Sequence, residues 1–196
     1  MTKSRLEAFS DGVIAILITI MVLELRPPHG TDLAALRPMV PTFLAYVLSF
    51  ILLGIYWNNH HHMLQATRHI SGGILWPNLH LLFWLSLLPF ATNWMGENYL
   101  APVPTAMYGV DLLCCALAWW ILQHCIVAAE GPHSLVAAAV GRDFKAKISL
   151  ALYIAAPPLA FVRPWIADGL YATVALIWLV PDRRMERTLN QRANAV

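Results

Sequence analysis

The architecture of this chain is best inferred from one stretch near its beginning, Arg5-Leu-Glu-Ala-Phe-Ser-Asp-Gly-Val-Ile-Ala-Ile-Leu-Ile-Thr-Ile-Met-Val-Leu-Glu24. Its apolar run, Gly12 to Leu23, covers twelve residues and is flanked by Ser10 and Asp11 on one side and by Glu24 on the other. A helix rises about 1.5 Å per residue, so this run spans roughly 18 Å of the ~30 Å hydrocarbon core of a bilayer. Polar side chains at that depth normally face a bundle interior or a water-filled cavity. The run therefore predicts a helix on the inside of a membrane protein.

The composition is that of an integral membrane protein. Of the 196 residues, 59% are hydrophobic and only 12% are charged, whereas soluble domains carry about 25% charged residues. We therefore expect a single transmembrane domain over residues 1–196, surrounded by the lipid bilayer. The sequence contains no nucleophile–base pair, phosphate-binding loop or paired-carboxylate motif. We accordingly expect no enzyme, no cofactor and no nucleic acid partner.

Apolar segments divide the chain into six expected helices, which indicates an all-α membrane protein with helix one innermost. The segments run approximately over residues 6–25, 41–64, 74–95, 106–129, 148–162 and 165–180. A loop is expected between the first two, and residues 135–140 are apolar but too short to span a bilayer. Only Arg163-Pro164 joins segments five and six, which predicts a helical hairpin. Pro157-Pro158 is expected to kink or interrupt segment five.

The orientation follows from the Lys and Arg residues in short connections. If the N-terminus is inside, ten basic residues are cytoplasmic and three are outside. The cytoplasmic ones are Lys3, Arg5, Arg68, Arg142, Lys145, Lys147, Arg183, Arg184, Arg187 and Arg192. The outer ones are Arg26, Arg37 and Arg163. This bias predicts six spans across the cell membrane with both termini in the cytoplasm, because an odd number would place the basic tail outside.

One face of helix one collects a distinct set of side chains. At about 100° per residue, the residues that share this face are Phe9, Gly12, Ile16, Thr19, Ile20 and Leu23. Asp11 falls nearly opposite, which indicates that protein contacts the helix on both faces. Taken alone, a face of this composition is more typical of ordinary helix packing.

Several short motifs occur in an order that resembles one known family. Arg5-x-x-x-Phe9-Ser10-Asp11 stands near the N-terminus before a short apolar helix, and Trp57 with a run of histidines lies on the second predicted helix. Residues 78–89, from Asn78 to Pro89, follow on the third, and a basic tail comes after Pro181. Together these features resemble the transmembrane protein 175 family of potassium channels, with the single-repeat length of its prokaryotic members.

The resemblance implies a homotetramer around a central pore lined by helix one. The resemblance also implies a filter of apolar side chains, and the sequence has no Thr-Val-Gly-Tyr-Gly motif. By position in the motif, Ile16 corresponds to the narrowest ring, Thr19 to a hydroxyl ring and Leu23 to a further apolar ring, and Ile20 shares their face. The resemblance further implies a modest preference for potassium among monovalent cations, with permeating potassium as the only metal and no cofactor.

Ser10 and Asp11 allow two interpretations. They can form a cation site at the cytoplasmic mouth, or a buried hydrogen-bond network that fixes helix one. The helix phase turns Asp11 away from the Ile16 face, and the family's Phe-Ser-Asp motif looks like a scaffold for the pore helix, so the network is favoured. Its expected members are Arg5, Phe9, Ser10, Asp11, Trp57, His60 and His61.

Other titratable side chains give weaker signals. Three consecutive histidines, residues 60–62, fan out by about 100° each on a helix and cannot converge on one ion, so we expect no metal site there. Glu24, at the outer end of helix one, is either an interfacial charge or part of an outer ring of carboxylates that attracts cations in an oligomer. Glu97 and Asp111 are lesser candidates for charge at the outer surface.

Two other classes of function stay open on the sequence alone. A proton-coupled secondary transporter would use Asp11, Glu24 and the histidines as a proton relay. Such transporters often have interrupted helices in two related halves, whereas only segment five carries a Pro-Pro pair here. A non-conducting membrane scaffold is the third possibility.

Overall fold

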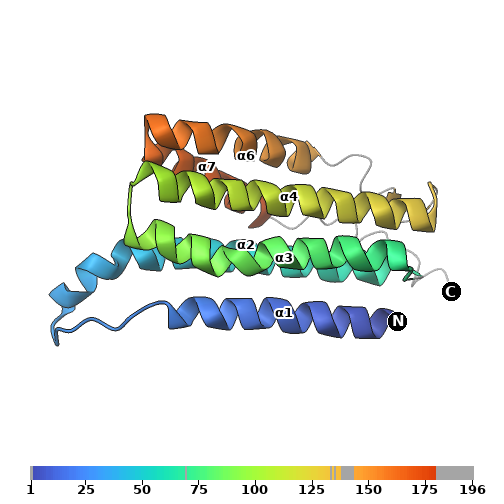
Figure 1. Cartoon of the computed structure of the whole chain (residues 1–196), viewed down its shortest axis with the longest axis horizontal. Helices are drawn as coiled ribbons and strands as arrows, with labels where there is room; N and C mark the ends of the chain where they lie inside the picture. Colours follow the sequence, from blue (N-terminus) through green and yellow to red (C-terminus); the bar gives the residue numbers. More distant parts are fainter. Residues whose placement is uncertain (1, 69, 133, 135, 138–143, 180–196) are drawn as a thin grey trace.

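The computed structural model describes residues 2–68, 70–132, 134, 136–137 and 144–179, and these residues form a helical bundle (Figure 1). The helices that lie wholly within the described residues are α1 (Lys3–Leu23), η1 (Leu33–Met39, a 3₁₀ helix), α2 (Val40–Ala66), α3 (Gly72–Glu97), α4 (Pro102–Glu130), α6 (Phe144–Val162) and α7 (Pro164–Leu179). Each of the predicted apolar segments coincides with one of the α-helices. The basic tail after Pro181 and most of the apolar residues 135–140 lie outside the described residues.

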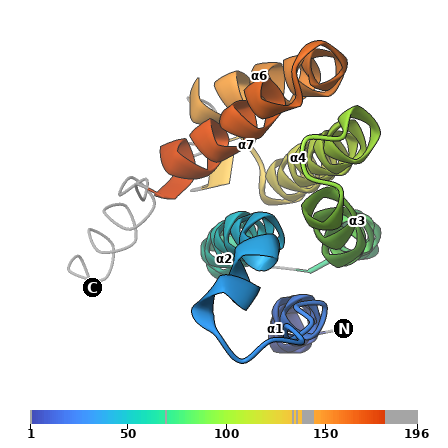
Figure 2. The ribbon, with the colours of Figure 1, turned by 90° about the vertical axis from the view of Figure 1, so that its left-hand side faces the viewer.

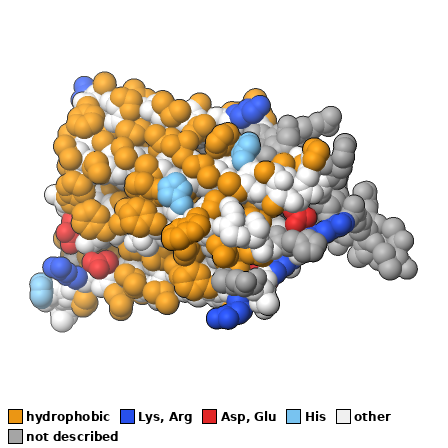
Figure 3. Space-filling model, turned by 45° about the vertical axis from the view of Figure 1, so that its right-hand side comes forward, with side chains coloured by type: hydrophobic (Ala, Val, Ile, Leu, Met, Phe, Trp, Pro, Cys, Tyr) orange, Lys and Arg blue, Asp and Glu red, His pale blue; other side chains and the backbone are white. Residues whose placement is uncertain are grey.

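The helices have the length and surface of membrane-spanning elements. Five helical segments, namely α1, η1 with α2, α3, α4 and α6, are long and apolar enough to cross a bilayer, and α7 is shorter at 16 residues. Hydrophobic side chains cover most of the face seen in Figure 3, and charged side chains gather at its two ends. The chain is therefore a multi-pass, all-helical membrane protein.

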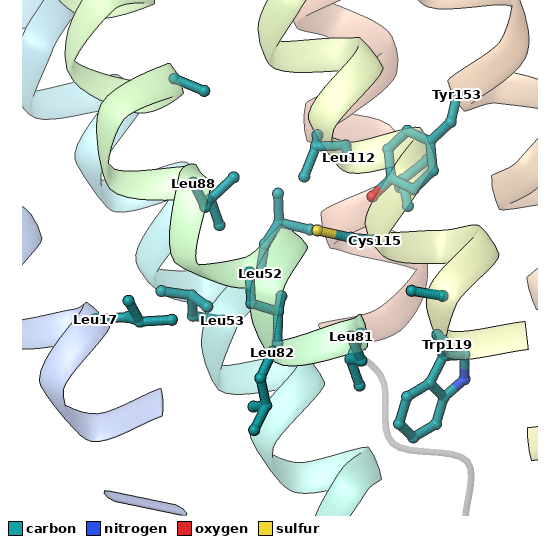
Figure 4. Packing of buried hydrophobic residues seen from close by; sticks show 14 of the residues in the cluster. Leu17, Leu52, Leu53, Leu81, Leu82, Leu88, Leu112, Cys115, Trp119 and Tyr153 are labelled. Atoms are coloured by element: carbon teal, nitrogen blue, oxygen red, sulfur yellow. The ribbon is translucent and has the colours of Figure 1, made fainter. Parts of the chain in front are cut away.

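Consecutive helices run in alternating directions, and α1 lies at one edge of the bundle. It packs against α2 and α3, whereas α4 packs against α3 and α6, and the α6–α7 hairpin lies on the far side (Figures 1 and 2). Buried leucines pack between these helices. Leu17 of α1 faces Leu53 of α2 and the leucines of α3 (Figure 4). In a bilayer this packing depends on close contact and hydrogen bonds rather than on the exclusion of water.

Part of the expected loop after helix one is a 3₁₀ helix, so the prediction of a loop there was wrong for residues 33–39. The Asp32 side chain accepts a hydrogen bond from the backbone N–H of Ala35 at 3.2 Å and so caps the first turn. Such local side-chain capping stabilises a short turn independently of any hydrophobic period, which is why the apolar pattern did not reveal it. Pro41 then lies in the first turn of α2, where a missing N–H costs little.

Segment five was expected to be kinked or interrupted at its Pro-Pro pair, and the interruption was wrong, because α6 runs through Pro157 and Pro158 without a break. Proline removes a backbone donor, but a non-helical segment facing lipid would leave still more backbone groups unpaired. Ala156, just before the two prolines, and Ala160, two residues after them, are fully buried. This close packing before and after the prolines stabilises the continuous helix. The predicted hairpin is confirmed: Arg163 alone separates α6 from α7, and its N–H donates to the Leu159 carbonyl at 2.9 Å.

Two glycines permit close helix contacts. A Cβ at Gly96 of α3 would come within 2.7 Å of the Thr42 Cα of α2. A Cβ at Gly109 of α4 would collide with the Tyr171 hydroxyl and would lie 2.7 Å from its Cζ. That hydroxyl donates to the Thr105 carbonyl at 3.0 Å, so the glycine makes room for a buried bond between α7 and α4.

Candidate functional site

Helix α1 has one face buried against α2 and α3 and one face exposed. The buried side chains are Leu6, Ser10, Ile14, Leu17 and Met21. The exposed face contains all the residues that the helical phase grouped together, including Phe9, Ile16, Thr19, Ile20 and Leu23. Ile16 is 56% exposed and Leu23 77% exposed, although both are large apolar side chains. This face is therefore available to lipid, to another subunit or to an ion pathway.

Thr19 is the hydroxyl residue on this exposed face. Its Oγ1 donates to the backbone carbonyl of Ile16 at 2.8 Å. A hydroxyl whose hydrogen is used within the helix keeps its oxygen lone pairs as acceptors. The face thus combines apolar side chains with one oxygen that can approach a cation.

A buried polar network holds the opposite face of α1. The Asn78 amide of α3 donates from Nδ2 to Ser10 Oγ at 3.0 Å, and its Oδ1 lies 2.7 Å from Nε2 of His60 on α2. Since the amide oxygen only accepts, His60 carries its hydrogen on Nε2. All three side chains are at most 1% exposed. One amide therefore connects the first three helices.

Asp11 belongs to a second group at the subunit surface. Trp57 Nε1 donates to Asp11 Oδ1 at 3.0 Å, and the Trp57 ring stacks on His61 with centroids 6.1 Å apart. Trp57 is 45% exposed, so this group lies at the edge of the subunit. Gln65 completes it through a 2.8 Å hydrogen bond to His61.

The structure therefore divides the expected network into two groups instead of one. His60 reaches Ser10 through Asn78, which the sequence analysis did not include among the network residues. The available signal was an amide within a predicted membrane-spanning segment, because a polar side chain there needs a hydrogen-bond partner from the protein. Arg5 is exposed, and none of the described residues accepts a hydrogen bond from it. Phe9 lies on the exposed face, away from both groups.

At the other end of α1, Glu24 lies beside α3. The Asn93 amide donates to Glu24 Oε2 at 3.3 Å. A groove of about 440 Å³ between the two helices is lined by Ile20, Glu24, Asn93 and Glu97, among others. Glu24 and Glu97 thus place two carboxylates beside the C-terminal part of the exposed face of α1.

Asp111 does not belong with these carboxylates. Asp111 is a residue of α4, and it is buried, with only 6% of its surface exposed. The prediction of an outer-surface charge was therefore wrong for this residue, because the sequence did not show which face of α4 packs against its neighbours.

Comparison with known proteins places this geometry in a family. The family model described as "Endosomal/lysosomal potassium channel TMEM175" matches residues 5–89. A potassium channel from Chryseobacterium sp. (strain P1-3) is 53% identical over 191 residues, which are 97% of this chain and 100% of the relative. The chain belongs to the TMEM175 family.

A solved structure extends the TMEM175 comparison beyond the matched residues. The crystal structure of a lysosomal potassium-selective channel TMEM175 homolog from Chamaesiphon minutus superposes with a TM-score of 0.78 at 27% identity. The match covers 91% of this chain and 96% of that one. The mouse endosomal/lysosomal proton channel TMEM175 is 26% identical over 82% of this chain, which spans about a third (34%) of the mouse protein.

Within this TMEM175-family chain, both polar groups lie in the matched part. Ser10, Asp11, Trp57, His60 and Asn78 all fall between residues 5 and 89. Helices α4, α6 and α7 lie beyond it and complete the bundle. Membership of this family supports an ion channel and gives no indication of catalysis.

Proposed function

We propose that this chain forms a homotetrameric cation channel in the cell membrane, with a modest preference for potassium over sodium. Four copies of α1 would surround a central pore, and residues 1–196 would form one transmembrane domain of six spans with both termini in the cytoplasm. The observation that carries the proposal is the exposed face of α1. Its large apolar side chains point away from the subunit while the opposite face is buried and hydrogen-bonded.

Ile16 would form the narrowest ring of this pore. Apolar side chains offer an ion no replacement for its hydration shell, so such a ring passes ions at a cost that grows with hydration strength. Potassium holds water less tightly than sodium, which favours potassium without carbonyl coordination. The free lone pairs of Thr19, one turn further along α1, would lower the barrier for a partly dehydrated ion.

Leu23 would form a further apolar ring, with Ile20 on the same side of the helix. Glu24 and Glu97 would make the outer mouth negative and raise the local concentration of cations. The groove that they line beside Ile20 supports this placement.

The two polar groups would serve as the scaffold of the pore helix. The buried amide of Asn78 ties Ser10 of α1 to His60, and Trp57 holds Asp11. This arrangement favours a structural role of Asp11 over a cation site, because its hydrogen-bonding oxygen faces Trp57 and not the Ile16 face.

A proton-coupled transporter is less well supported. A relay would need Asp11, Glu24 and the histidines to form a chain, yet Glu24 follows Asp11 by thirteen residues along α1, which is roughly 20 Å at about 1.5 Å per residue. Helix α6 is also continuous and provides no broken-helix binding site.

The test compares two exposed positions of α1. Ile16→Asn replaces an apolar ring with amides that bind water and ions, so conductance should rise and the potassium preference should fall. Val22 is also exposed, at 46%, but lies about 120° away from Ile16 around the helix. Val22→Asn should leave both properties unchanged. The assay is the reversal potential under bi-ionic potassium and sodium in liposomes. Equal currents and equal reversal potentials for the two variants would refute a pore lined by this face.

A further inference from the structure

A second cavity lies away from α1, between α2, α4, α6 and α7. Its volume is about 130 Å³. Its walls include several aromatic side chains, among them Tyr56, Trp119, Tyr153 and Trp178. Figure 4 shows Trp119 and Tyr153 at the α4–α6 side of the core, and Figure 2 shows α6 and α7 on the side of the bundle remote from α1. The cavity is therefore separate from the proposed pore.

Polar side chains from three helices also line this cavity, among them those of Gln123, Asn59 and Lys147. Gln123 of α4 is only 8% exposed, and its amide makes no hydrogen bond with any residue that the structure describes. Asn59 of α2 likewise has no hydrogen-bond partner among the described residues. Lys147, in the first turns of α6, is exposed and adds a positive charge at the cavity.

Two unpaired amides that line a largely apolar cavity point to a ligand that accepts hydrogen bonds. An amide left without a partner in such surroundings costs about 1–3 kcal/mol, so a bound acceptor would be stabilising. Two amides can donate hydrogen bonds to oxygen acceptors, and an ammonium group attracts an anion. A ligand that fits must carry acceptor oxygens and a negative charge beside an apolar group.

The size of the cavity limits that apolar group. A cavity of about 150 Å³ lined by apolar side chains accepts a benzene-sized group. The cavity here is therefore large enough for a segment of one acyl chain but not for a whole lipid. The aromatic walls suit a methylene chain, and the polar side chains suit the group to which that chain is attached.

We propose that this cavity binds an anionic phospholipid. The phosphate pairs with Lys147, an ester carbonyl accepts from the amides of Gln123 and Asn59, and the first methylenes of that chain lie between Trp119 and Tyr153. The site lies toward the end of the bundle where α1 begins, so the lipid belongs to the leaflet on that side. This inference does not depend on the proposed pore.

Thermal unfolding of the purified full chain in detergent tests the proposal. The probe is dioctanoyl phosphatidylglycerol, compared with dioctanoyl phosphatidylcholine and with inorganic phosphate. A ligand that binds the folded state raises the midpoint of unfolding, and the dose dependence gives an apparent Kd. We expect the anionic lipid to raise the midpoint at concentrations at which the zwitterionic lipid and phosphate do not.

Variants test whether the anionic lipid stabilises the protein by binding in this cavity. Lys147→Gln and Gln123→Leu should each weaken the apparent Kd for the anionic lipid by at least about tenfold, the factor expected for one lost polar or charged contact. Arg68→Gln is the matched control, because Arg68 is an exposed cation near the same end of the bundle that does not line the cavity. Equal responses to the two lipids, an equal response to phosphate, or an unchanged Kd in Lys147→Gln would overturn the proposal. Lys147 is exposed, so its variant should fold even if Gln123→Leu does not.

Discussion

Asn78 offers the most direct test of how this bundle positions its first helix. The substitution Asn78→Leu replaces the amide with an apolar side chain of similar size. Two hydrogen bonds are lost, the 3.0 Å bond to Ser10 Oγ and the 2.7 Å bond to His60 Nε2. Because Ser10, His60 and Asn78 are at most 1% exposed, no solvent can replace the amide.

The expected loss of stability follows from these two bonds. Interhelical hydrogen bonds in membrane proteins contribute on average about 0.6 kcal/mol and at most about 1.7 kcal/mol each. Two such bonds therefore give an expected loss of about 1–3 kcal/mol in the free energy of unfolding. A buried donor left unpaired moves the value toward the upper end, since it keeps its full desolvation cost.

Unfolding of the purified protein in mixed detergent–SDS micelles, followed by far-UV circular dichroism, measures this loss. Asn58→Leu is the matched control: Asn58 lies on α2, is exposed and has no hydrogen bond to a described residue, so its loss should be close to zero. A double-mutant cycle isolates the bond to Ser10. Ser10→Ala should destabilise the wild type but should cost almost nothing once Asn78 is leucine.

The reasoning fails if the two substitutions act independently. Additivity within about 0.5 kcal/mol would mean that Ser10 and Asn78 do not share a bond in the folded protein. The same variants link stability to function, because α1 carries the proposed pore face. Potassium flux per mole of protein in liposomes should fall in Asn78→Leu and should be unchanged in Asn58→Leu.

Three further predictions follow from close contacts and topology. Gly109→Ala drives a Cβ against the Tyr171 ring and should cost about 1–3 kcal/mol in the same unfolding assay, with partial recovery in the Gly109→Ala, Tyr171→Leu double variant. In Gly96→Ala the new Cβ would lie 2.7 Å from the Thr42 Cα, so a similar loss of stability should persist when Thr42→Ser is added. Full recovery in that double variant would show that the clash involves only the Thr42 methyl group. In a background without Cys114, Cys115 and Cys125, a membrane-impermeant maleimide added outside cells should label Gly30→Cys and not Thr2→Cys. The reverse pattern would invert the proposed orientation.

The sequence by itself determined the class of the protein and the approximate position of its helices. Long apolar segments can satisfy their backbone groups in lipid only as helices, so hydropathy and length are sufficient to place them. The phase of α1 could also be predicted, because a 3.6-residue period orders side chains around a helix without knowledge of its neighbours. Ile16, Thr19 and Leu23 accordingly fall on one exposed face in the structure as well.

Contacts between helices could not be predicted from hydropathy or from the helical period. Which polar side chains meet depends on the distance, rotation and depth of helices far apart in the chain, and no local period encodes those quantities. His60 was therefore predicted to lie in one network with Asp11, whereas the structure links His60 to Ser10 through Asn78. Asp11 instead accepts a hydrogen bond from Trp57.

The same limit explains the errors at Pro157-Pro158 and at Asp111. Proline disfavours a helix locally, but packing and the absence of water decide whether the helix persists. Asp111 is charged and thus expected at a surface, yet the packing of α4 against its neighbours buries it. The amide of Gln123 at the aromatic cavity has the same origin, because only the packing of α2, α4, α6 and α7 places it there.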